Sequence, residues 1–93
     1  MFENDIIELK PSQIMESEWG SRYILVYATC IEKKHSSCCT IRVPSLTIES
    51  NQGFTPSKMR NILKAIIENM DYLWLHAYDL TYPPERIIEK NKD

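Results

Sequence analysis

Four residues with metal-binding side chains lie within one ten-residue segment. They are Cys30, His35, Cys38 and Cys39, in the pattern C-x4-H-x2-C-C. Thiolate and imidazole are the ligands that zinc prefers in tetrahedral sites, although this spacing matches no zinc-finger pattern. The alternative is that Cys30 and Cys39 are small core residues on paired strands and that His35 is a loop residue in water. We expect this alternative, and therefore no metal and no cofactor.

The sequence shows no group of residues with the spacing of an enzyme active site. A nucleophilic Cys–His pair also needs an orienting third group and an oxyanion donor, and neither is evident at a recognisable spacing. The only two glycines, Gly20 and Gly53, are too few for a glycine-rich phosphate loop or a dinucleotide fingerprint. The sequence therefore predicts a protein that is not an enzyme.

The middle of the chain is basic and lies between two acidic ends. Residues 22–64 hold seven of the eleven Lys and Arg residues but only two of the thirteen Asp and Glu residues. Such asymmetry can mark a face that binds nucleic acid, although charges distant in sequence can also pair across a fold. Nucleic-acid binding through this segment is the alternative function. Six basic side chains could converge on a phosphate backbone: Lys33, Lys34, Arg42, Lys58, Arg60 and Lys64.

A long amphipathic helix is the element that must position many of these groups. Thr55 can cap it, and Pro56 suits its first position because the N–H that proline lacks would have no partner there. We predict one helix from residue 56 to about residue 77, although the aromatic-rich residues 71–82 could instead form a strand. The apolar residues that recur at helical spacing on one side of it are Met59, Ile62, Leu63, Ile66, Ile67, Met70, Leu73, Trp74 and Ala77.

Two β-prone segments precede this helix. Residues 22–31 alternate two largely apolar sets, which predicts a central strand that is covered on both faces, by a helix on one and by a second layer or a symmetry mate on the other. Residues 39–43 predict a second strand, antiparallel to the first because the connection is short. Pro44 should bend that strand before residues 45–49 continue it, which allows a three-stranded meander. Residues 11–20 predict a short helix at the amino-terminal end.

These elements predict a two-layer α+β domain. An antiparallel hairpin or three-stranded meander packs against one long helix, with a short N-terminal helix before it. The order of helix, hairpin and helix, with basic residues in the first turns of the last helix, is similar to that of a double-stranded-RNA-binding domain. The resemblance is topological and implies that the basic residues contact RNA, while the helix departs from the lysine- and alanine-rich pattern of that family.

The end of the predicted long helix is apolar nearly all round. Tyr72 and Leu75 face away from the main apolar stripe, so either the C-terminal tail or a second protein must cover this end. Its aromatic residues are of the kind that anchor protein interfaces, although a domain of this size also needs most of its large residues in the core. The predicted partner-binding residues are Tyr72, Trp74, Leu75, Tyr78 and Tyr82.

The composition is that of an ordinary globular protein. The 93 residues are 43% hydrophobic and 26% charged, which suits one globular domain over residues 1–93. The sequence has no apolar run that could span a bilayer, its first ten residues do not look like a secretory signal, and its three cysteines suit a reducing compartment. We therefore expect a cytoplasmic protein with no membrane partner. The expected function is a small non-enzymatic interaction module, such as an inhibitor, immunity or phage-type accessory protein, that binds another protein or forms a homodimer.

Overall fold

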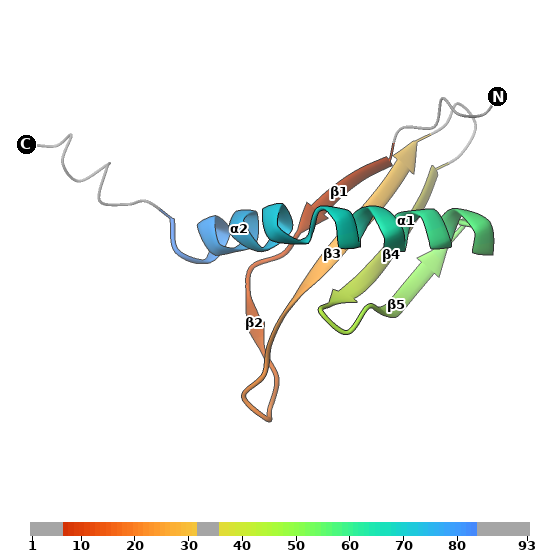
Figure 1. Ribbon diagram of the computed structural model, residues 1–93. Helices are drawn as coiled ribbons and strands as arrows, with labels where there is room; N and C mark the ends of the chain where they lie inside the picture. The colour runs from red at the N-terminus through yellow and green to blue at the C-terminus, as the bar shows by residue number, and fades with distance from the viewer. Residues whose placement is uncertain (1–6, 32–35, 84–93) are drawn as a thin grey trace, which may run out of the picture.

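The computed structural model describes residues 7–31 and 36–83 as an antiparallel sheet with two helices across one face (Figure 1). This arrangement confirms the predicted α+β class. The strands are β1 (Ile7–Pro11), β2 (Met15–Glu16), β3 (Arg22–Ile31), β4 (Ser36–Val43) and β5 (Thr47–Gln52), and the helices are α1 (Pro56–Glu68) and α2 (Met70–Thr81).

The sheet has the strand order β1-β3-β4-β5, and β2 also pairs with β3. The predicted central strand and hairpin are confirmed, because β3 and β4 pair antiparallel with Ala28 opposite Cys39 and Val26 opposite Ile41. Pro44 follows the end of β4, where the sequence predicts a break, and β5 completes a three-stranded meander. The sequence left residues 4–9 open between a short strand and a turn, and the structure has β1 from Ile7; β2 was not predicted.

The predicted N-terminal helix is wrong, because residues 15–23 form a β-hairpin between β2 and β3. The Ser17 N–H donates to the Ser21 carbonyl at 2.8 Å, and the Gly20 N–H donates to the Ser17 carbonyl at 2.9 Å. The Ser17 hydroxyl also accepts from the N–H groups of Trp19 and Ser21, both at 3.2 Å. Gly20 has a φ of 89°, which favours glycine in this turn. Without this helix, the topological likeness to a double-stranded-RNA-binding domain is lost.

The prediction of one long helix is wrong at Asn69, which separates α1 from α2. The Asn69 side chain donates to the Ala65 carbonyl at 2.8 Å, and its backbone N–H is shared between the carbonyls of Ala65 and Ile66. Asparagine often interrupts a helix in this way, because its side chain competes for backbone groups. The predicted start is confirmed, since the Thr55 hydroxyl accepts from the Lys58 N–H at 3.2 Å.

Residues 71–81 belong to helix α2, so the alternative prediction of a strand in this segment is wrong. In Figure 1, α2 continues roughly in the direction of α1 and extends beyond β1 and β3. In the described ranges of the chain, neither helix is both long and apolar enough to cross a membrane.

The core lies between the helices and one face of the sheet. Alternate residues of β3 and β4 point to this face, as the two-residue period of a strand requires. Within the part of the chain that the structure describes, neither helix covers the other face, where Tyr27 is exposed. The buried residues are Ile24, Val26, Ala28 and Cys30 of β3, Cys39, Ile41 and Val43 of β4, Phe54, and Met59, Ile62, Ile66, Leu73 and Ala77 of the helices.

Candidate functional site

The side of α2 that faces away from the core carries large apolar side chains. On the inner side, Leu73 and Ala77 are almost completely buried. We call the exposed set the outer surface of α2. It consists of Tyr72, Leu75, Tyr78 and Tyr82, whose exposed fractions are 63%, 62%, 54% and 51%. All four belong to the predicted partner-binding set, and the structure brings them to one end of the helical layer.

The spacing of these residues groups them along the helix. Leu75, Tyr78 and Tyr82 stand at positions i, i+3 and i+7, so they follow one another along one side. The rings of Tyr78 and Tyr82 are 4.8 Å apart between centroids, and those of Tyr72 and His76 are 5.9 Å apart. Ring pairs at these distances are attractive. The contacts restrict the rotamers of exposed aromatic side chains, which lowers the entropy lost when a partner binds.

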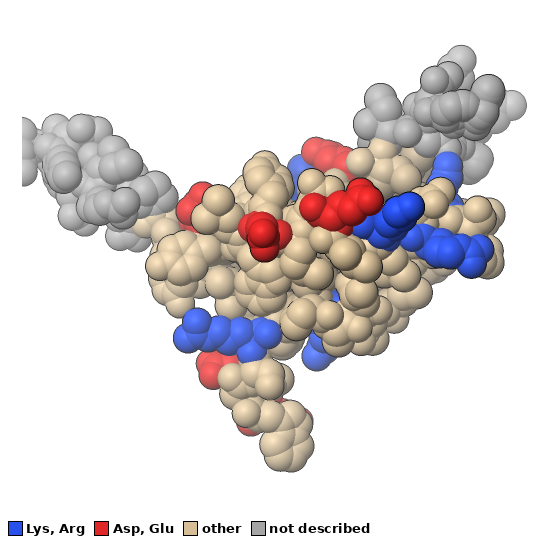
Figure 2. All heavy atoms as spheres, in the orientation of Figure 1, with Lys and Arg blue, Asp and Glu red and all other residues tan. Residues whose placement is uncertain are grey.

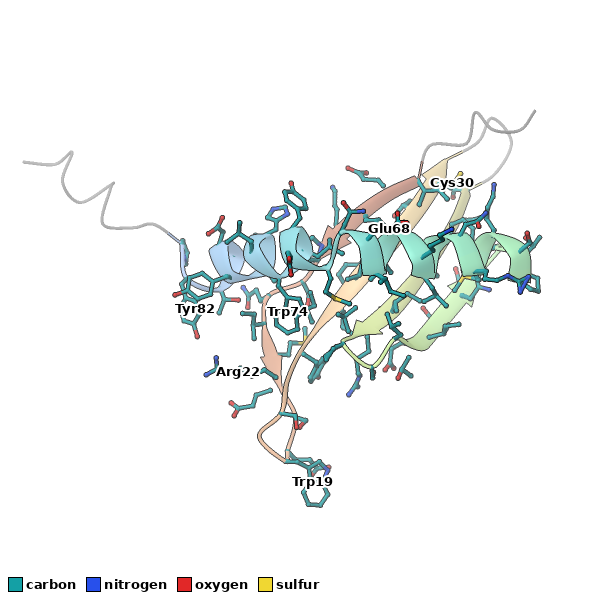
Figure 3. All side chains as sticks on the ribbon, in the orientation of Figure 1. Trp19, Arg22, Cys30, Glu68, Trp74 and Tyr82 are labelled. Atoms are coloured by element: carbon teal, nitrogen blue, oxygen red, sulfur yellow. The ribbon has the colours of Figure 1, made fainter. Side chains whose placement is uncertain are left out.

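Trp74, the fifth residue of the predicted set, is placed differently. Its side chain is partly buried and packs against the core (Figure 3). It therefore helps to attach α2 to the sheet. Replacing it would change the position of the helix as well as any contact with a partner.

The charged residues of α2 have one sign. Asp71 and Asp79 are exposed on α2, and residues 70–83 contain no Lys or Arg. In Figure 2, red acidic side chains lie over α2 and its junction with α1, whereas blue basic side chains gather over the first turns of α1. A partner of the outer surface of α2 would thus meet an acidic rim.

Two further exposed apolar residues of the helices were missing from the predicted set. Ile67 is 53% exposed although its spacing assigns it to the buried stripe, and Leu80 is 43% exposed. Ile67 comes just before Asn69, where α1 ends. The competing hydrogen bonds of an asparagine were the one sequence signal that could have indicated a change of direction there.

The structure does not bring the three cysteines together. Cys30 and Cys39 are buried on the core face of the sheet, whereas Cys38 is exposed on the opposite face. Burial raises the pKa of the Cys39 thiol, and the neighbouring charge of Cys38 raises it further, while a backbone hydrogen bond at Ala28 lowers it. His35 lies outside the described residues. Across residues 7–31 and 36–83, no three His, Cys, Asp or Glu side chains could hold a metal ion.

The described basic residues divide between two faces. Arg42 follows the buried Ile41 in β4, so its side chain lies on the face of the sheet away from the helices. Lys58, Arg60 and Lys64 belong to α1, which covers the opposite face. The structure therefore places Lys58, Arg60 and Lys64 on the other side of the sheet from Arg42, and Lys33 and Lys34 lie outside the described residues.

Comparisons with known proteins show no relative, since no family model, no curated protein and no solved structure matches this chain. The outer surface of α2 is therefore interpreted from its own geometry. It offers apolar area, tyrosine hydroxyls and an acidic rim, which are properties of a binding surface.

Proposed function

We propose that this chain is a small non-enzymatic protein-interaction module that binds another protein through the outer surface of α2. The observation that carries the proposal is a helix that buries one side and exposes Tyr72, Leu75, Tyr78 and Tyr82 on another. Single exposed apolar side chains are normal on a protein surface, but a group of them marks an interaction site. Tyrosine is also enriched among the residues that dominate binding energy.

The geometry supports a specific kind of partner. Leu75, Tyr78 and Tyr82 have the i, i+3, i+7 spacing with which a helix enters an apolar groove. Asp71 and Asp79 favour basic side chains at the edges of that groove. The partner is thus a protein with an apolar groove and a basic rim. Inhibitors, immunity proteins and phage accessory proteins are classes that act by such docking.

Charge also favours a different protein over a second copy at this surface. A dimer through α2 would bring Asp71 and Asp79 of one protomer close to those of the other, without a Lys or Arg in residues 70–83 to balance them. Like charges placed together at an interface reduce affinity. Homodimerisation stays a prediction, but the charges of α2 do not favour it through this surface.

The test begins with native mass spectrometry of the protein purified from its host under mild conditions, which identifies a bound partner by mass. The affinity of that partner is then measured for Leu75→Ala, Tyr78→Ala and Tyr27→Ala. Tyr27 is a matched control because it is an exposed tyrosine on the open face of the sheet. We expect each α2 variant to lose about 2 kcal/mol or more of binding free energy, while the control retains its affinity.

Circular dichroism must show that each variant is folded. The proposal fails if the folded α2 variants bind as tightly as the wild type, or if Tyr27→Ala is the variant that loses affinity. It fails also if native mass spectrometry shows a homodimer and the α2 substitutions convert that homodimer to monomers.

A further inference from the structure

An apolar groove of about 380 Å³ lies between α1 and the edge strand β5, on the helix side of the sheet. We call it the edge groove. Ile48 pairs with Ile41 and therefore faces the same side of the sheet. Ile41 is completely buried, whereas Ile48 is 47% exposed, so the helical layer covers β4 more completely than β5. The apolar lining of the groove consists of Ile48, Phe54, Pro56, Met59 and Leu63.

Two polar residues complete the lining, Asn51 and Arg60. The Asn51 amide donates to the Phe54 carbonyl at 3.0 Å and accepts from the Phe54 N–H at 3.2 Å, so it fixes the connection between β5 and α1. Arg60 is exposed and makes no hydrogen bond or ion pair with residues 7–31 or 36–83. The groove thus offers an apolar wall with a guanidinium at its rim. This combination suits an aromatic side chain, because a guanidinium binds favourably over an aromatic ring.

The surroundings of the edge groove are basic. Residues 50–67 contain Lys58, Arg60 and Lys64 but no Asp or Glu. In Figure 2, these positive charges gather over the first turns of α1. The amino-terminal end of a helix also carries a partial positive charge. An occupant of the groove should therefore combine an aromatic ring with a neighbouring negative charge.

The hairpin between β2 and β3 carries such a combination. Trp19 is 88% exposed at its tip (Figure 3). The Ser17 hydroxyl accepts from the N–H groups of Trp19 and Ser21, so an ordered turn presents the ring and less entropy is lost on binding. Glu18 is exposed beside Trp19, and residues 11–21 contain two Glu but no Lys or Arg. The tip of the hairpin is therefore aromatic and acidic.

We propose that Trp19 of one copy of this chain occupies the edge groove of a second copy, and that the two copies exchange their hairpins about a two-fold axis. Figure 3 places Trp19 away from the first turns of α1, so a chain does not fill its own groove. A two-fold axis allows both contacts to form at once. Each contact buries an indole and places Glu18 near the basic rim that includes Arg60.

This dimer is independent of the function proposed for the outer surface of α2. The edge groove lies beside β5 and the hairpin tip lies beyond β3, and neither includes a residue of α2. The acidic residues of α2, which disfavour pairing of two copies through that helix, take no part in the hairpin exchange. A dimer formed in this way leaves the outer surface of α2 open to another protein.

The test is sedimentation equilibrium of the full chain from about 5 to 500 µM, a range that detects micromolar affinities. A small contact area predicts an affinity of this order. We expect the weight-average mass to rise with concentration from the monomer value of 10.9 kDa towards twice that value. Trp19→Ala should raise the dissociation constant by about tenfold or more. Tyr27→Ala is the matched control, because Tyr27 is an exposed aromatic residue on the open face of the sheet.

Charge reversal tests which surfaces meet. Glu18→Lys and Arg60→Glu should each raise the dissociation constant by about threefold or more, because each places like charges together. The double variant should bind more tightly than either single variant, since opposite charges face each other again. Glu68→Lys is the control for the change in net charge, because Glu68 is exposed on α1 and does not line the groove.

Four results would overturn the proposal. The first is a monomer mass throughout the concentration range. The second is that folded Trp19→Ala associates as strongly as Tyr27→Ala. The third is that the double charge reversal associates no more strongly than the single variants. The fourth is a dimer that Tyr78→Ala dissociates and Trp19→Ala does not, which would assign the contact to α2 and contradict the function proposed for that helix as well.

Discussion

Cys38 and Cys39 are adjacent in sequence but lie on opposite faces of the sheet. Cys39 pairs with Ala28 and is buried under the helices, whereas Cys38 pairs with Thr29 and is exposed, with its Sγ 3.8 Å from Gln52 Oε1. Successive side chains of a strand alternate between faces, so neighbouring thiols have different access to solvent.

This difference predicts selective thiol chemistry. A disulfide reagent such as DTNB should modify Cys38 in the folded protein, while Cys30 and Cys39 react about a hundredfold more slowly because they require local or global opening. Stopped-flow absorbance with the wild type and with Cys38→Ser measures this directly. A fast phase that survives in Cys38→Ser would contradict the placement of the thiols.

The raised pKa of Cys39 predicts a loss of stability in alkaline solution. An unperturbed thiol has a pKa of about 8.5, whereas burial raises the pKa of the Cys39 thiol and keeps it protonated to higher pH in the folded state. Above that pH the unfolded chain loses a proton that the folded chain retains, so the free energy of unfolding falls as pH rises. Urea unfolding between about pH 7.5 and pH 10.5 should show a larger decrease for the wild type than for Cys39→Ala. Equal decreases would show that other groups cause the change.

Ile66 and Ile67 are neighbours in α1 with opposite exposure. Ile66 is completely buried between helix and sheet, and Ile67 is 53% exposed. Ile66→Ala should therefore lower the free energy of unfolding by about 2–5 kcal/mol, whereas Ile67→Ala should change it by less than about 1 kcal/mol. Urea denaturation of the two variants checks this. Similar losses for both would mean that α1 is rotated relative to the structure described above.

Substitution of each of the two glycines by alanine gives a second comparison between matched variants. Both have positive φ, 104° at Gly53 and 89° at Gly20, so alanine is disfavoured at each by about 1–2 kcal/mol. At Gly53 a Cβ would also lie 2.5 Å from the Ser37 hydroxyl oxygen, whereas at Gly20 it would meet no atom within 4 Å. Gly53→Ala should thus destabilise the protein more than Gly20→Ala in thermal unfolding.

The double variant Gly53→Ala with Ser37→Gly separates the two causes. It removes the clash but keeps the backbone strain, so we expect it to recover part of the loss relative to Ser37→Gly alone. If the double variant recovers no stability, backbone strain alone accounts for the destabilisation by Gly53→Ala.

The fold could be predicted where a signal was local and strong. The period of two in residues 22–31 and the Thr55–Pro56 start of α1 were sufficient for β3 and for the helix, and both are confirmed. The N-terminal region was mispredicted because Ser17 and Gly20 support a turn as well as a helix end. The choice depends on pairing with β3, which is a contact of the folded chain.

Some features of the candidate surfaces could be predicted from local sequence patterns, and others could not. Exposure of Tyr72 and Leu75 follows from helical spacing, so the sequence could indicate the outer surface of α2. The position of Trp74 against the core depends on how α2 crosses the sheet. The stacking of Arg42 on Tyr23 could not be predicted, because the two residues are nineteen positions apart and meet only through the register of β3 and β4.

β5 contains a β-bulge, with Glu49 as the extra residue, because Thr40 pairs with Ser50 and Ile41 pairs with Ile48. This bulge affects how the sheet edge meets other molecules. β5 is the last strand in the order of the sheet, and all of its residues are exposed. A flat apolar strand in this position would recruit strands from other molecules and promote aggregation. The extra residue twists this edge, and Glu49, Ser50, Asn51 and Gln52 make it polar. Glu49, which also pairs with Arg42, thus makes the β5 edge a poorer template for strands of other molecules.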